Sequence, residues 1–129
     1  MKLRIKGNSI RLRLLRSEVA ALAEKGAVYE TVQFGDRVFT YSIASEDAGG
    51  GISAHFLADH ILVKLPETLA LDWANSDTVG LEASQPAGDG GEVLKILIEK
   101  DFVCISRPDD PDNADAFSEL SVPPASAGG

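Results

Sequence analysis

The chain of 129 residues, with 44% hydrophobic and 25% charged residues, has the size and composition of one globular domain. Its net charge of -8 argues against general binding of nucleic acid. The single cysteine, Cys104, excludes an internal disulfide and fits a reducing compartment, and its simplest role is that of a buried structural thiol. Charged residues interrupt every apolar run, which predicts a cytoplasmic protein with neither a signal peptide nor a membrane span.

The first predicted element is a strongly basic hairpin. Residues 1–16 carry six of the twelve Lys and Arg and no acid, so the remaining residues hold six bases against twenty acids. The alternation of polar and apolar residues in MKLRIKGNSIRLRL predicts two strands, and the Gly-Asn pair at 7–8 suits a tight turn between them. In that register Arg4 lies directly opposite Arg11.

The basic side chains of this hairpin share one face, where opposed like charges are destabilising unless something negative lies over them. The predicted anion-binding residues are Lys2, Arg4, Arg11 and Arg13. Three sources of compensating negative charge are possible. They are ions of the solvent, acidic residues of the same chain, and an external phosphate-bearing molecule or acidic protein. The same-chain acids are Glu30, Glu82, Glu92, Glu99 and the segment from Asp109 to Asp115.

A helix and a second hairpin follow. Ser17 is placed to cap the helix and Gly26 to end it. Two alternating runs over residues 27–44, with Gly-Asp at 35–36 between them, predict the hairpin. Residues 45–51 include three consecutive glycines and are typical of a loop.

The same order of patterns then returns, shifted by 51 residues. In this alignment Leu22 meets Trp73 and Val28 meets Val79, and about four residues are inserted near residues 86–91. Duplication and a chance likeness between two similar segments both remain open. The prediction is an α+β fold of two strand-strand-helix-strand-strand pseudo-repeats, residues 1–44 and 52–105. We expect them to form a mostly antiparallel sheet system that could close into a barrel.

The last segment differs in composition from the rest. A single domain is predicted over residues 1–106, followed by an acidic, Pro-rich tail over 107–129. Phe117 and Leu120 are the tail residues suited to docking on the domain.

Motifs for catalysis, metals and cofactors are lacking in the sequence. The glycine clusters lie between predicted strands and do not open a helix, so neither fits a phosphate loop. His55 and His60 fall on one predicted hairpin, but spacing fixes no third metal ligand, so solvated or hydrogen-bonded imidazoles are the simpler interpretation. The residues from Asp109 to Asp115 lack the glycine and the final glutamate of a calcium loop. We therefore assign no catalytic residue, metal or cofactor.

Several segments resemble a family of small bacterial proteins of unknown function. These are RIKGNSIRLRL, SEVAALAEKG, VGLEASQ, ILIEKDFVCI and NADAF, and the resemblance extends over nearly the whole chain. It implies no activity or ligand. A basic strand face in an eight-strand barrel is also similar to the triphosphate tunnel enzymes. Their first strand alternates acids with lysine, whereas KLRIK has no acid, which removes the metal-binding half of that chemistry.

These observations predict a small binding or assembly module whose basic hairpin contacts its own acidic tail or an anionic ligand or partner. The alternative is an enzyme that acts on phosphorylated small molecules. A homodimer is a further expectation, because Phe34, Phe39 and Tyr41 are a large aromatic set for one small core and antiparallel sheets expose edges.

Overall fold

The structure is a computed structural model that describes residues 1–47, 50–104 and 117–122. It contains two helices and ten strands within those ranges. In chain order they are β1 (Lys2–Lys6), β2 (Ser9–Leu14), α1 (Arg16–Lys25), β3 (Ala27–Phe34), β4 (Arg37–Glu46), β5 (Ser53–Leu57), β6 (His60–Pro66), α2 (Glu67–Ala74), β7 (Gly80–Pro86), β8 (Val93–Lys100), β9 (Phe102–Cys104) and β10 (Phe117–Val122).

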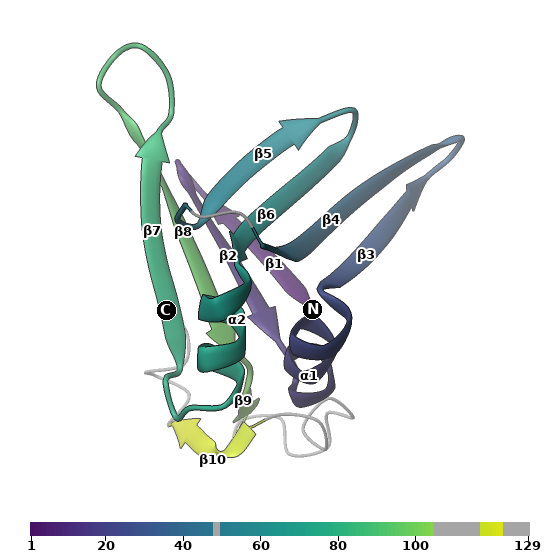
Figure 1. The fold of residues 1–129 in the computed structure, drawn as a ribbon. Coiled ribbons are helices and arrows are strands. Elements are labelled where there is room, and N and C mark those ends of the chain that lie inside the picture. Colours follow the sequence, from purple (N-terminus) through teal and green to yellow (C-terminus); the bar gives the residue numbers. More distant parts are fainter. Residues whose placement is uncertain (48–49, 105–116, 123–129) are drawn as a thin grey trace.

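Eight of the strands form two sheets of four (Figure 1). Sheet A has the order β1-β2-β8-β7, and sheet B has the order β3-β4-β6-β5. The outer pairs are antiparallel hairpins, but the central pairs β2–β8 and β4–β6 are parallel. The α+β class is therefore confirmed. The expected antiparallel pairing holds for the four outer pairs and is corrected at the two central pairs, so both sheets are mixed.

The sheets do not close into a barrel, which corrects the other part of the fold prediction. The edge strands β5 and β7 are not paired through their backbones, and a side chain of β7 bonds to the backbone of β5 instead. Gln85 Oε1 accepts a hydrogen bond from the Ala54 N–H at 2.8 Å, and Gln85 Nε2 donates to the Ala54 carbonyl at 2.8 Å. One amide thus satisfies the backbone of one residue and joins the two sheets at this edge.

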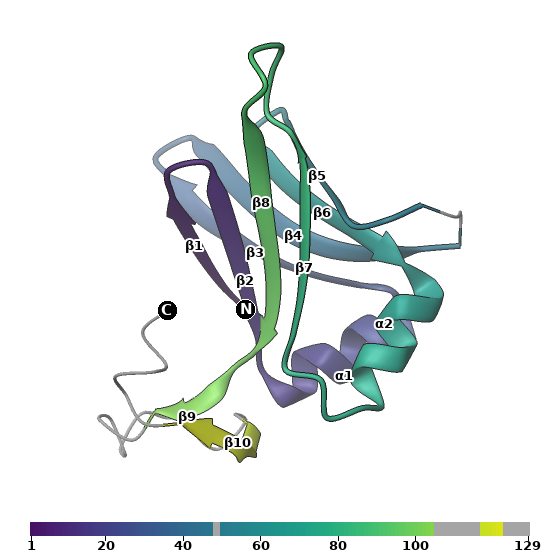
Figure 2. The ribbon, with the colours of Figure 1, turned by 90° about the vertical axis from the view of Figure 1, so that its left-hand side faces the viewer.

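The hairpin registers follow from their turns. In the first hairpin Lys2 lies opposite Arg13 and Arg4 opposite Arg11, as predicted. In the third hairpin the turn residues Ala58 and Asp59 have φ of 52° and 62°, the left-handed region that a tight hairpin turn requires. The hairpin turns point away from the two helices in both views (Figures 1 and 2).

Helix α1 begins two residues earlier than expected. The N-cap of α1 is Leu15 and not Ser17, because the Leu15 N–H donates to Glu18 Oε1 at 2.8 Å and the extended Leu15 backbone starts the helix. Gly26 ends α1 in the left-handed conformation, as predicted. Neither helix in the described ranges has the length and apolar character needed to cross a bilayer.

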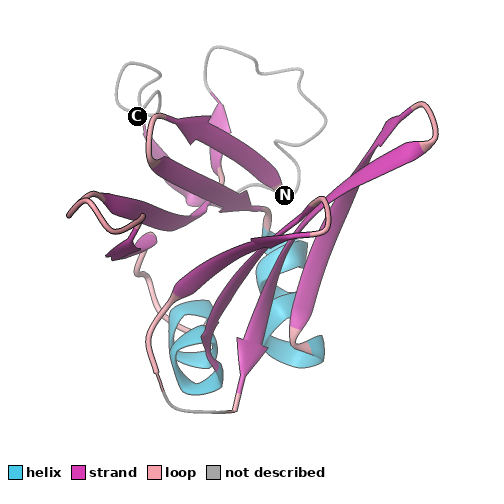
Figure 3. Ribbon diagram, turned by 90° about the horizontal axis from the view of Figure 1, so that it is seen from above, coloured by secondary structure: helices cyan, strands magenta, loops and turns pink. Residues whose placement is uncertain are grey.

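The core lies between the inner faces of the sheets and the helices (Figure 3). Both helices contribute two buried residues, Val19 and Leu22 from α1 and Ala70 and Trp73 from α2. The largest fully buried apolar side chains are Trp73, Leu12, Leu14, Leu22, Ile43, Leu65, Ile96, Ile98 and Val63. At about 25 cal/mol per Å² of apolar surface removed from water, this cluster is the main stabilising contribution to the fold.

The C-terminal part of the described chain returns to the domain. Strand β10 pairs in parallel with β9, and the Phe117 N–H donates to the Asp101 carbonyl at 2.9 Å. Phe117 is only 6% exposed. The predicted docking of Phe117 is therefore confirmed, and the strand that follows it was not anticipated.

Candidate anion-binding face

The predicted anion-binding residues lie together on the outer face of sheet A. Because strand side chains alternate, the burial of Leu12 and Leu14 on the inner face leaves Arg11 and Arg13 on the outer one. Pairing of Ser9 with Lys95 adds a base from β8. We call this set the basic face: Lys2, Arg4, Lys6, Arg11, Arg13 and Lys95.

Glu99 on β8 is the principal acid on this face. The parallel pairing of β2 with β8 places Glu99 beside Arg13. Glu99 Oε1 lies 3.3 Å from Arg11 Nε and 3.4 Å from Arg13 Nε, so one carboxylate oxygen serves two guanidinium groups. The three side chains are only 18 to 23% exposed, which limits screening by solvent. Glu99 was among the acids considered from the sequence, and the structure brings it to the face.

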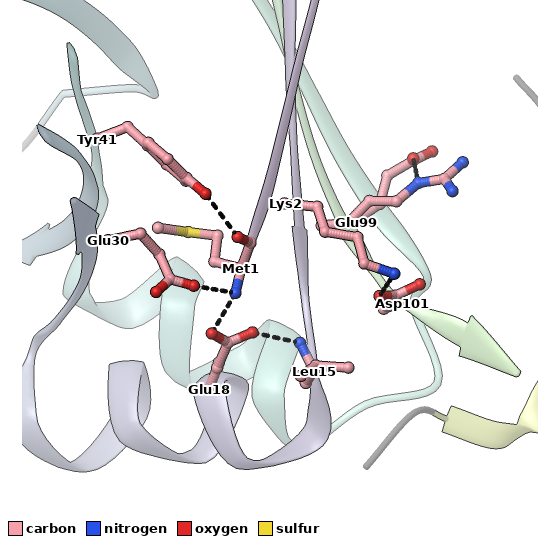
Figure 4. Close-up of polar contacts among 9 residues, drawn as sticks. Met1, Lys2, Leu15, Glu18, Glu30, Tyr41, Glu99 and Asp101 are labelled. Atoms are coloured by element: carbon pink, nitrogen blue, oxygen red, sulfur yellow. Dashed lines mark hydrogen bonds and ion pairs between the residues drawn. The ribbon is translucent and has the colours of Figure 1, made fainter. Parts of the chain in front are cut away.

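The other acidic residues lie at the border of the basic face or away from it. Asp101, which sequence reasoning did not consider, is buried, and its Oδ2 lies 3.1 Å from Lys2 Nζ (Figure 4). Glu92 accepts a hydrogen bond from Asn8 Nδ2 at 3.1 Å near the turn. Glu30 lies on sheet B and contacts Met1. The segment from Asp109 to Asp115 lies outside the described residues.

Arg11 carries an unused hydrogen-bond donor. Its Nη1 is buried and finds no acceptor among the residues that the structure describes. Next to it on the same face, Leu97 lies opposite Arg11 in the ladder and Glu82 lies opposite Leu97. A shallow depression lined by Glu82, Ser84, Lys95 and Leu97 continues from this point. A buried guanidinium donor that lacks an acceptor costs free energy. An anion bound on the outer face beside Arg11 would supply that acceptor.

The outer face of sheet B is chemically different. His55 Nε2 is 3.0 Å from Ser53 Oγ, and His60 Nε2 is 2.6 Å from Ser42 Oγ. Within residues 1–47 and 50–101, no three His, Cys, Asp or Glu side chains are grouped so as to hold a metal ion. The structure thus places both histidines in hydrogen bonds to serines.

The amino group of Met1 forms a second charged cluster, beside the first strand. Met1 is a buried residue, and its amino group donates to Glu18 and lies 2.8 Å from Glu30 Oε2 (Figure 4). The Met1 carbonyl accepts a hydrogen bond from the Tyr41 hydroxyl at 2.9 Å. Burial by itself would lower the pKa of this amino group, but hydrogen bonds and charge from Glu18 and Glu30 outweigh burial and raise the pKa.

This raised pKa predicts a loss of stability at alkaline pH. A group whose pKa is higher in the folded state contributes its full stabilisation below its unfolded pKa, about 8 for an α-amino group. That contribution disappears as the pH rises through the folded value. We expect the free energy of unfolding, measured with urea, to fall above about pH 8, and to fall less in Glu30→Gln.

Tyr41 provides the control for that measurement. Burial, and then the charges of Glu30 and Glu18, raise the pKa of Tyr41, so its titration also lowers stability at higher pH. In Tyr41→Phe the loss that begins above about pH 8 should remain. An unchanged pH profile in Glu30→Gln would contradict the assignment.

The chain matches the model of a known protein family. The model of a family of unknown function (DUF7009) matches residues 1–121, and the chain belongs to this family. No curated protein and no solved structure gives a match. The predicted membership in an uncharacterised family is therefore confirmed.

Proposed function

We propose that the protein is a binding module that holds an anionic ligand or partner on the basic face of sheet A. The observation that carries the proposal is the buried Nη1 of Arg11, a charged donor without an acceptor among the described residues. Guanidinium groups contact phosphate and carboxylate oxygens through two N–H groups at once, and such charge-assisted bonds are stronger than neutral ones.

The balance of charge on this face supports the same function. The six bases share the outer face of sheet A with Glu82 and Glu99, and Asp101 lies at its border. Among the described residues of this face the bases outnumber the acids, whereas the whole chain has a net charge of -8. Local positive charge on an acidic protein favours a specific anionic partner and disfavours nonspecific binding.

Comparison of the two sheets supports duplication of one half of the chain and a specialised role for the outer face of sheet A. Shifted by 51 residues, the ladder between Lys2 and Arg13 corresponds to the ladder between Ser53 and Lys64. We propose that the chain arose by duplication of one strand-strand-helix-strand-strand unit. Sheet A and sheet B are then equivalent, and their outer faces differ because one carries arginines where the other carries His55 and Leu62.

The pairing also revises one step of the proposed alignment. Val28 lies opposite Ile43 in sheet B, and Leu81 lies opposite Ile98 in sheet A. If Ile43 corresponds to Ile98, Val28 corresponds to Leu81 and not to Val79. Two of the four inserted residues then precede β7, and the other two lie in the turn between β7 and β8.

Titration calorimetry with inorganic tripolyphosphate tests the binding proposal. We expect saturable binding that weakens with added salt. Changing Arg4 and Arg11 together to Gln should weaken it about tenfold or more, since each charge-assisted bond contributes about 1.5 to 3 kcal/mol. Lys64→Gln is the matched control, because Lys64 occupies the position equivalent to Arg13 on the other sheet and pairs with Glu46.

The outcomes separate the proposal from its alternatives. An equal loss in Lys64→Gln, or no binding at millimolar tripolyphosphate, would contradict the assignment of the basic face. Binding that requires magnesium, with release of phosphate, would favour an enzyme acting on phosphorylated molecules. That alternative has less support here, because the bases lie outside the sheets and the inner face carries Leu3 and Ile10.

A further inference from the structure

Sheets A and B end in four edge strands, and three of them have features that discourage pairing with another chain. Strand β1 alternates Lys2, Arg4 and Lys6 along its length. Strands β5 and β7 are joined through Gln85. Charge and edge-to-edge contacts of this kind are the usual protection of exposed strands. Strand β3 carries one charged residue, Glu30, and has neither proline nor glycine.

The outer half of β3 offers unpaired backbone groups to solvent. The Thr40 N–H donates to the Asp59 carbonyl on the β6 side, so Thr40 and Thr31 form a pair without hydrogen bonds between them. The N–H and C=O of Thr31 therefore point out of sheet B, as do those of Tyr29 and Gln33. No described segment pairs with this edge. Residues 31 to 34 are all exposed, and their pairing with β4 is regular up to the turn.

The same hairpin exposes much of the apolar surface of the molecule. Among the nine exposed large hydrophobic residues in the described chain, four belong to this hairpin: Tyr29 (69% exposed), Val32 (40%), Phe34 (63%) and Val38 (41%). Val32 lies opposite Phe39, so apolar side chains continue from β3 onto β4. Figure 1 shows this hairpin projecting away from sheet A. A regular edge strand with exposed apolar side chains and a single charged residue is a template for strand addition.

We propose that β3 pairs with β3 of a second copy of this chain, which would join two copies of sheet B into one eight-stranded sheet. A twofold axis places a strand antiparallel to itself, so the contact uses one surface twice and closes at a dimer. Charge is compatible with this occupant, because Glu30 is the one charged side chain of the strand. Glu30 meets its own copy only if the axis passes through residue 30, and any register centred on residues 31 to 33 avoids it.

Sedimentation of the full-length chain at tens of micromolar tests this proposal. We expect a dimer, and we expect Thr31→Pro to weaken the dimer about tenfold or more, because proline removes an outward N–H from the edge. Thr31→Ser keeps that N–H and should leave dimerisation unchanged. Val32→Lys is a second test that leaves the backbone intact, since it adds like charges near the axis. Circular dichroism confirms that each variant is folded.

Three results would overturn the proposal. One is a monomer at every concentration, and another is a dimer that Thr31→Pro and Val32→Lys leave intact. The third is a monomer that dimerises once the chain ends after Val122, which would mean that the C-terminal residues of the same chain occupy the edge. Dimerisation does not require the basic face, so Arg4→Gln should have no effect on it.

Discussion

Replacing Trp73 by alanine is expected to lower the free energy of unfolding by about 3 to 5 kcal/mol, the usual cost of removing a large aromatic side chain from a core. Trp73 is 1% exposed in α2, its indole N–H donates to the Val79 carbonyl at 3.4 Å, and Lys100 Nζ lies 5.6 Å from its ring centre. The change removes apolar burial, a hydrogen bond and a cation–π contact together.

Leu22→Ala is the companion change in the other half of the chain. Leu22 is also 1% exposed and corresponds to Trp73 at the shift of 51 residues, so we expect a cost of about 2 to 5 kcal/mol. Leu71→Ala is the control, since Leu71 lies in α2 but is 39% exposed. Urea denaturation measures all three. An unchanged midpoint for Trp73→Ala or Leu22→Ala would mean that the two helices do not have equivalent places in the core.

Local structure was predictable because it depends on neighbours in the sequence. The Gly7-Asn8 turn fixes the register that brings Arg4 opposite Arg11, and period-two alternation places both on the face away from Leu12. The hairpins and the end of α1 at Gly26 follow from equally short patterns. Their energetics are decided within a few residues, so a single sequence contains the information.

Long-range pairing was not predictable in the same way. The parallel contacts β2–β8 and β4–β6 join strands from different halves of the chain. Hydrophobic alternation is the same for a parallel and an antiparallel neighbour, so the pattern could not choose between them. The N-cap of α1 was also missed, because Glu18 satisfies the Leu15 N–H from inside the helix while Ser17 offered a more familiar signal.

The candidate site also has a locally determined part and a part that depends on long-range strand pairing. Five of the six bases come from the first hairpin, and four of these five were predicted from the sequence. Lys95 and the shared position of Glu99 depend on the β2–β8 pairing. The sequence predicts Glu99 as an acid on a neighbouring strand, but no local pattern places it between Arg11 and Arg13. Asp101 was missed because it follows a strand in sequence and reaches Lys2 only through the fold.

The C-terminal segment leads to the second large expected effect. Phe117→Ala should cost about 3 kcal/mol, the lower end of the range for phenylalanine, because Phe117 packs at one end of the core. The Arg16 guanidinium carbon lies 4.6 Å from its ring centre and Lys100 Nζ lies 5.4 Å away, on a ring that is 6% exposed. Lys100 is itself only 2% exposed, and the burial of the Phe117 ring does not depend on screening by salt, so the cost should be similar at low and high ionic strength.

Because Phe117 itself packs on the core, a deletion of the tail cannot test whether tail carboxylates contact the basic face. Removing residues 107–129 also removes Phe117, so stability would fall at every ionic strength whether or not the carboxylates of the tail contact the arginines. Changing Asp109, Asp110, Asp112 and Asp115 to Asn keeps the anchor and separates the two effects. If the tail covers the face, this variant should lose about 0.2 to 1 kcal/mol per contact at low salt only and should bind tripolyphosphate more tightly than the unaltered chain. Unchanged stability and unchanged affinity would leave an external anion as the partner of Arg11.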